Sequence, residues 1–167
     1  MTESAVVRNV TVVPATPATM EVAVNLFRVQ LGEHEIFPAE QALREVTRTV
    51  LSNSSHGFIL LAWAEPEFIG IAYAAAHLSA EHGGTVGWLE ELYVAPERRG
   101  QGVGSTLLAA VISRAQQLGW RAVELEVVAG HERAVPLYLR HEFLPVSRAR
   151  FTRACTAQGL VTPDYSA

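Results

Sequence analysis

A short glycine-rich stretch constrains this chain more than any other feature. Residues 99–105 read Arg-Gly-Gln-Gly-Val-Gly-Ser, and they follow an apolar run at 86–94. They also open an amphipathic helix whose apolar stripe is made of Val103, Leu107, Leu108, Val111, Ala115 and Leu118. Glycines ahead of a helix leave backbone N–H groups uncovered, and these groups form an anion site together with the helix dipole. Arg98 and Arg99 can add charge that pairs with phosphate oxygens. The sequence therefore predicts a strand, a diphosphate-sized anion loop and a helix in direct succession.

Two familiar phosphate loops do not fit this stretch. All thirteen basic residues are arginine, so the lysine of a Walker A loop is excluded. A dinucleotide fingerprint needs Gly-x-Gly-x-x-Gly directly after its strand, whereas here the third glycine comes one residue early and residues 95–99 intervene. Glu124 and Glu126 nevertheless stand where a ribose-binding acid would lie. A nucleotide-binding reductase module is therefore an alternative.

Length and composition limit the other possibilities. With 167 residues we expect a single domain at 1–156 and a C-terminal tail at 157–167. The formal net charge of −4 gives no basic surface for nucleic acid or anionic lipid, so neither is an expected partner. A single cysteine and six histidines without ligand spacing predict no metal site. No apolar run reaches the roughly 18 residues of a membrane helix, and we expect a cytoplasmic protein.

The hydropathy pattern predicts a mixed α/β sheet with helices on both faces. Apolar and β-branched runs predict strands at 5–13, 57–64, 68–77, 86–94 and 121–128, and a terminal hairpin at 143–155. Helical spacing predicts helices at 16–31, from about 38, at 103–118 and at 132–141.

Two motifs resemble those of the GNAT superfamily of N-acetyltransferases. Residues 99–104 fit its Arg/Gln-x-x-Gly-x-Gly/Ala signature, and residues 134–143 are similar to its Ala-x-x-Leu-Tyr-x-x-x-Gly-Phe signature. His131 and Glu142 depart from the usual Asn and Gly. The resemblance implies a mostly antiparallel central sheet that is splayed between two parallel strands.

The resemblance also implies acetyl-CoA as co-substrate, in a gap between the strands that end at Val94 and near Val128. The pantetheine arm would contact backbone at Leu92, Tyr93 and Val94. The diphosphate would lie on the loop, and His131 would add a contact from the next helix. The cofactor-binding loop residues are then Arg99, Gly100, Gln101, Gly102, Val103, Gly104 and Ser105.

Acetyl transfer by direct attack of an amine on the thioester needs a base and benefits from an acid. Tyr138, which alone would more often be a core residue, matches the family's acid. Glu90 is the first candidate for the base, because Leu89-Glu90-Glu91 resembles the Leu-Glu-Asp run of diamine acetyltransferases. Glu126 is the second, in the place of a proposed base of ribosomal-protein N-terminal acetyltransferases. As neighbours on a strand, Glu90 and Glu91 should point to opposite faces.

The acceptor is expected to be a small-molecule amine. Glu33 and Glu35 lie in a segment that borders the acceptor pocket in the resembled family, and with Glu91 they are the candidate substrate-binding residues. Carboxylates around one opening would attract a cation. A non-catalytic acyl-CoA sensor and an acetyltransferase of protein N-termini or side chains are alternatives, and family habit implies a possible homodimer.

Overall fold

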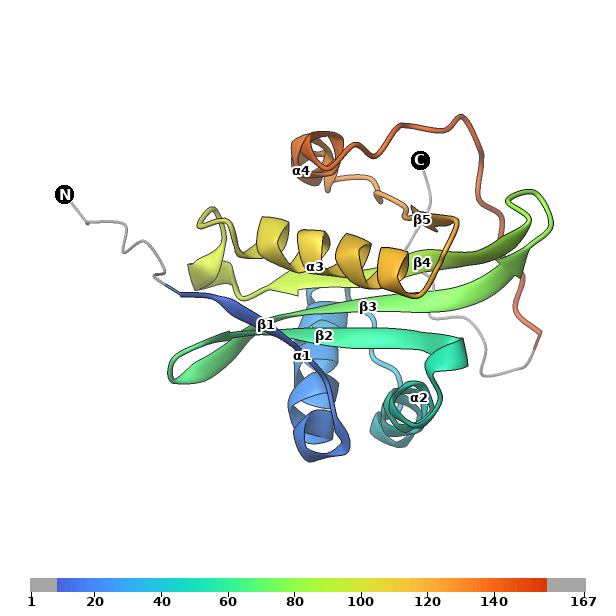
Figure 1. The fold of residues 1–167 in the computed structure, drawn as a ribbon. Helices are drawn as coiled ribbons and strands as arrows, with labels where there is room; N and C mark the ends of the chain where they lie inside the picture. Colours follow the sequence, from blue (N-terminus) through green and yellow to red (C-terminus); the bar gives the residue numbers. More distant parts are fainter. Residues whose placement is uncertain (1–8, 156–167) are drawn as a thin grey trace.

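The protein builds one five-stranded mixed sheet in the order β1-β2-β3-β4-β5 (Figure 1). The computed structural model describes residues 9–155. The strands are β1 (Thr11–Pro14), β2 (Gly57–Ala64), β3 (Glu67–Ser79), β4 (Gly84–Val94) and β5 (Ala122–Glu124). The first four pair as antiparallel neighbours, and β5 joins β4 in parallel. The predicted mixed α/β class is confirmed.

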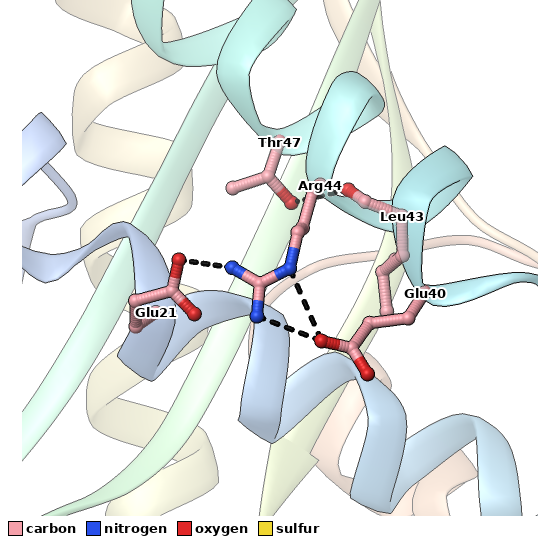
Figure 2. A network of polar contacts seen from close by, with 5 residues as sticks. All are labelled: Glu21, Glu40, Leu43, Arg44 and Thr47. Carbon is pink, nitrogen blue, oxygen red and sulfur yellow. Dashed lines mark hydrogen bonds and ion pairs between the residues drawn. The ribbon is translucent and has the colours of Figure 1, made fainter.

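Helices cover both faces of this sheet. They are α1 (Met20–Glu33), α2 (Glu40–Ser52), α3 (Val103–Gln117) and the short α4 (Val135–Arg140). Figure 1 shows α3 on one face and α1 with α2 on the other, with α4 on the α3 side. Arg44 of α2 donates to Glu21 of α1 and to Glu40 of its own helix, so a charged network joins the two helices (Figure 2).

Each strand of the sheet centre is buried from both sides. In β2, Leu60 and Ala62 belong to the core under α3, whereas Ile59 and Leu61 belong to the core under α1 and α2. This two-sided burial explains why β2 reads as a continuous apolar run and not as an alternation. The predicted stripe of α3 is buried except at Leu118, which is the C-cap and is 37% exposed.

Strands β4 and β5 stay together for only three residue pairs. Val86, Gly87 and Trp88 pair with Ala122, Val123 and Glu124, and β4 then runs on to Val94 with a partner on its β3 side alone within the described part of the chain. The strand predicted at 121–128 therefore ends at Glu124. The expected splay of the sheet begins at this point and leaves one edge of β4 open.

The predicted hairpin at 143–155 is wrong, since those residues contain no strand. Pro145 removes a backbone donor there, and Leu144 and Phe151 are 82% and 93% exposed, so no burial stabilises pairing. Ion pairs from Arg148 to Glu81 and from Arg150 to Glu126 hold this segment instead.

The predicted first strand begins at Thr11, and its start at 5–8 lies outside the described residues, as does the predicted tail at 157–167. Within residues 9–155, every helix is too short or too polar to cross a membrane.

Candidate functional site

The loop before α3 presents a row of unused backbone donors. None of the six N–H groups from Gly100 to Ser105 donates to an acceptor within the described residues. Gly100 and Gly102 have φ values of 73° and 86°, which favour glycine, and Gly102 is the N-cap of α3. Consecutive free amides at a helix N-terminus form an anion-binding concavity. We call Gly100–Ser105 the amide row, and its role in binding the cofactor stays a prediction.

Gly104 differs from the other two glycines of the loop. It lies inside the first turn of α3, and a Cβ there would meet Leu137 at 3.6 Å and Val94 at 3.8 Å, which are ordinary contacts. Neither backbone conformation nor neighbouring protein atoms therefore require glycine at this position.

Arg99 is engaged by protein groups. Its Nη2 donates to both carboxylate oxygens of Glu33, at 2.9 Å and 2.7 Å, and its Nε donates to the Val94 carbonyl at 2.8 Å. The guanidinium also lies over the Tyr93 ring, 5.6 Å from the centroid. Arg99 thus ties the end of α1 to the end of β4. The charge of Glu33, a predicted substrate contact, is balanced by this pair.

A bulge in β4 carries the two adjacent glutamates. Tyr73 of β3 faces Glu91 and Ala74 faces Leu89, so Glu90 is an extra residue without an opposite partner. As a result Leu89 and Leu92 both pack on the core under α3, although they are three positions apart. The expected strict alternation, with Glu90 and Glu91 on opposite faces, is therefore wrong.

Glu91 is the carboxyl group that its surroundings perturb most. The pKa of Glu91 is raised to about 7, mainly by burial and also by the charge of Glu90, while a hydrogen bond from the Gln30 amide acts in the opposite direction. Gln30 itself is 6% exposed, on the inner face of α1. Partial burial also raises the pKa of Glu90, and the charge of Arg150 lowers it.

The other predicted carboxylates are in different surroundings. Glu126 forms an ion pair with Arg150, whose guanidinium also lies over the Trp88 ring, 5.1 Å from the centroid. Glu35 is exposed, with a φ of 59°, in the connection between α1 and α2. Two of the predicted acidic residues, Glu33 and Glu126, are therefore in ion pairs with arginine, whereas Glu90 and Glu91 lie next to each other at the bulge.

Tyr138 projects from α4 toward the core under α3. Burial raises the pKa of its phenol, and its ring meets Phe143 edge-on at 5.9 Å. At the two ends of the same segment lie the residues that depart from the expected motif. The ring of His131 packs against the ring of His34, with 4.7 Å between the two centroids. Glu142 adopts a φ of 64°, which explains why glycine suits its position.

Sequence reasoning missed Gln30 and the Arg99–Glu33 pair. Gln30 follows Leu26 and Phe27 at helical spacing, so a polar residue on the apolar face of a helix was the available signal. The Arg99–Glu33 pair joins residues that are 66 positions apart, and no local pattern marks it.

Comparison with known proteins agrees with this geometry. A model of the acetyltransferase (GNAT) family matches residues 23–143. The chain is 34% identical over 94 residues to the aminoalkylphosphonate N-acetyltransferase of Salmonella typhimurium, a match that covers 56% of this chain and 60% of that protein. The matches span between 27% and 60% of the length of the curated relatives.

Solved structures share the fold over nearly the whole described chain. An integron cassette protein from the mobile metagenome of Cole Harbour Salt Marsh superposes with a TM-score of 0.78 at 25% identity, over 87% of this chain and 90% of that one. The aminoglycoside N-acetyltransferase AAC(6')-Iy in complex with CoA superposes with a TM-score of 0.76 at 20% identity, over 89% of this chain and 96% of that one.

Proposed function

Because the chain belongs to the acetyltransferase (GNAT) family, we propose that it transfers the acetyl group of acetyl-CoA to the amine of a small molecule. One observation carries the proposal: among residues 9–155, the six backbone amides at the N-terminus of α3 have no acceptor, and they lie next to the end of the β4 edge that no described strand covers. A row of donors suits a diphosphate, and an open strand edge suits the amide groups of a pantetheine arm.

The cofactor would extend along this edge. The diphosphate would accept hydrogen bonds from the amide row, and the pantetheine would pair with backbone at Leu92–Val94. His131, which contacts His34, would border the same path from the start of the α4 segment. A backbone amide near Leu92 is our candidate for the donor to the oxyanion that develops on the thioester.

We assign the base to Glu91 in preference to Glu90 and Glu126. Glu126 is already paired with Arg150, whereas Glu91 has a pKa of about 7 and is held by Gln30. A carboxylate of that pKa is half ionised at neutral pH and accepts a proton from an ammonium group better than an ordinary glutamate does. Glu90, which shares the bulge, is the alternative base.

The reaction would proceed by direct attack. Glu91 takes one proton from the ammonium group, and the free amine nitrogen then forms a bond to the acetyl carbonyl carbon while the carbon–sulfur bond breaks. The departing thiolate takes the hydroxyl proton of Tyr138, the second proton that the nitrogen loses restores the Tyr138 hydroxyl, and Glu91 releases its proton to solvent. Since burial raises the pKa of Tyr138, this acid stays protonated at neutral pH. Overall, an ammonium ion and acetyl-CoA yield an amide, free CoA thiol and one proton.

A cationic acceptor suits the carboxylates that remain. Glu90 and Glu91 lie together at the bulge. Glu35 is exposed and lies two residues after the end of α1. Glu33 supports the site through Arg99 instead of meeting the substrate directly. The acceptor class that we propose is a primary amine such as an amino sugar or a polyamine. A homodimer and a cytoplasmic location stay predictions.

Release of free thiol from acetyl-CoA in the presence of an acceptor panel tests the proposal. The panel contains a polyamine, an amino sugar, a peptide with a free N-terminus and an acidic amino compound. We expect release that depends on the polyamine or the amino sugar. Release with the peptide alone would favour the alternative in which the acceptor is a protein N-terminus or side chain. Release with the acidic compound alone would contradict the argument that the carboxylates select a cationic acceptor.

Thermal shift separates the two remaining alternatives. Acetyl-CoA should raise the melting temperature increasingly with its concentration, and NADH should not. A shift with NADH alone would favour the reductase module. A shift with acetyl-CoA but no thiol release with any acceptor would favour the acyl-CoA sensor.

A further inference from the structure

One hydrogen bond joins the amide row to the end of α4. Ser105 Oγ lies 2.7 Å from His141 Nε2 in half-buried surroundings. Ser105 is the third residue of α3, a position from which side chains reach back toward the N-terminal amides of a helix. His141 is the C-cap of α4. The imidazole of His141 therefore lies outside the amide row and contacts it at the Ser105 hydroxyl.

The direction of this hydrogen bond decides what the serine can do. A hydroxyl has a single hydrogen to donate, but it also accepts. If Nε2 of His141 is unprotonated, the Ser105 hydroxyl donates its hydrogen to Nε2 and has none left for an anion. If Nε2 carries a proton, the imidazole donates to Oγ, and the hydroxyl hydrogen is free to turn toward an anion on the amide row.

We propose that His141 is a positioning residue for the diphosphate of the cofactor, because it donates to Ser105 and so directs the serine hydroxyl onto that anion. This inference rests on the proposed function. Ser105 then contributes its hydroxyl in addition to its backbone amide. His141 does not touch the cofactor, and its effect is confined to ligands that place an anion on the amide row.

Calorimetry with two thioesters tests this role. Acetyl-CoA carries the diphosphate, and S-acetylpantetheine lacks it. Ser105→Ala removes the hydroxyl that meets the anion, so it should weaken acetyl-CoA binding about tenfold, the scale of one hydrogen bond to a charged group, and leave S-acetylpantetheine binding unchanged. Replacing His141 by leucine keeps that hydroxyl but leaves it unoriented, so it should weaken acetyl-CoA binding by a smaller factor, about threefold, again without effect on S-acetylpantetheine. The double variant should lose little more than Ser105→Ala alone.

Two controls keep folding apart from positioning. His141→Gln places an amide nitrogen donor near the position of Nε2, so it should retain most of the affinity for acetyl-CoA. His56→Leu removes an exposed imidazole next to β2 and should change neither affinity. Melting temperatures of all variants report whether α4 stays docked.

The outcomes are separable. If the wild-type protein fails to bind acetyl-CoA, the proposed function falls, and this inference falls with it. If the wild type binds and His141→Leu binds equally well, only the inference is overturned. An equal loss for both thioesters would also overturn it, because His141 would then only stabilise α4.

Discussion

At the scale of single residues, Glu91 is the group whose chemistry the fold changes most. Its pKa rises from 4.5 to about 7, chiefly through burial. Between those two values the folded protein holds a proton that the unfolded chain has released. The contribution of this group to the free energy of unfolding is therefore full below about pH 4.5 and is lost as the pH rises through 7.

Replacing Glu91 by glutamine removes that ionisation and keeps an acceptor for Gln30. Relative to wild type, Glu91→Gln should gain about 1–2 kcal/mol of stability at about pH 8 and much less at about pH 5. Urea unfolding at both pH values measures this difference. The exposed Glu97→Gln is the control, and an equal gain at both pH values would show that Glu91 is not protonated in the fold.

Tyr138→Phe separates the proposed acid from a core residue. The variant keeps the edge-on contact with Phe143 and deletes only the hydroxyl. Turnover should fall about 100-fold or more, with little change in melting temperature. Unchanged turnover with a lower melting temperature would make Tyr138 a packing residue only.

Replacing Glu142 by glycine tests whether the backbone is strained at this position. Its φ of 64° lies where glycine is least strained, at the end of α4. Glu142→Gly should therefore stabilise the protein, by about 0.5–1 kcal/mol after the larger entropy of the unfolded chain is subtracted. Glu132→Gly, in the turn before α4, is the contrasting control and should destabilise. A loss of stability in Glu142→Gly would contradict the strain argument.

At the scale of elements, charged side chains fix how α1 meets its neighbours. Arg99 joins its C-terminal end to β4, and Arg44 joins its first turn to α2 (Figure 2). The two contacts therefore bear on the site in different ways, since only Arg99 contacts β4.

Arg44→Gln should lower the urea midpoint without changing acetyl-CoA affinity. It removes the guanidinium that bridges Glu21 and Glu40, and the amide row and the β4 edge do not depend on it. Arg48→Gln, one turn further along α2, provides the matched control and should leave the midpoint unchanged. Equal midpoints for both variants would show that the network in Figure 2 contributes nothing to stability.

At the scale of the whole molecule, sequence reasoning predicted the parts that local pattern governs. The stripe of α3 follows from helical spacing, and the glycine loop follows from the backbone conformations of Gly100 and Gly102. The point where β4 and β5 part, the bulge at Glu90 and the pairing of Arg99 depend on contacts between distant segments. Those contacts decide which glutamate is buried more deeply, whereas the sequence favoured Glu90 only through the resemblance of Leu89-Glu90-Glu91 to the Leu-Glu-Asp run of diamine acetyltransferases. Which of the two is the base stays a prediction.

Hydrogen exchange of the wild-type protein with and without acetyl-CoA tests the central claim most directly. The claim is that the cofactor lies on the open edge of β4 and on the amide row. Acetyl-CoA should slow exchange at residues 92–94 and 100–105 and leave β1 and α2 unchanged. Binding of acetyl-CoA without protection at 100–105, or with protection confined to other segments, would contradict the account.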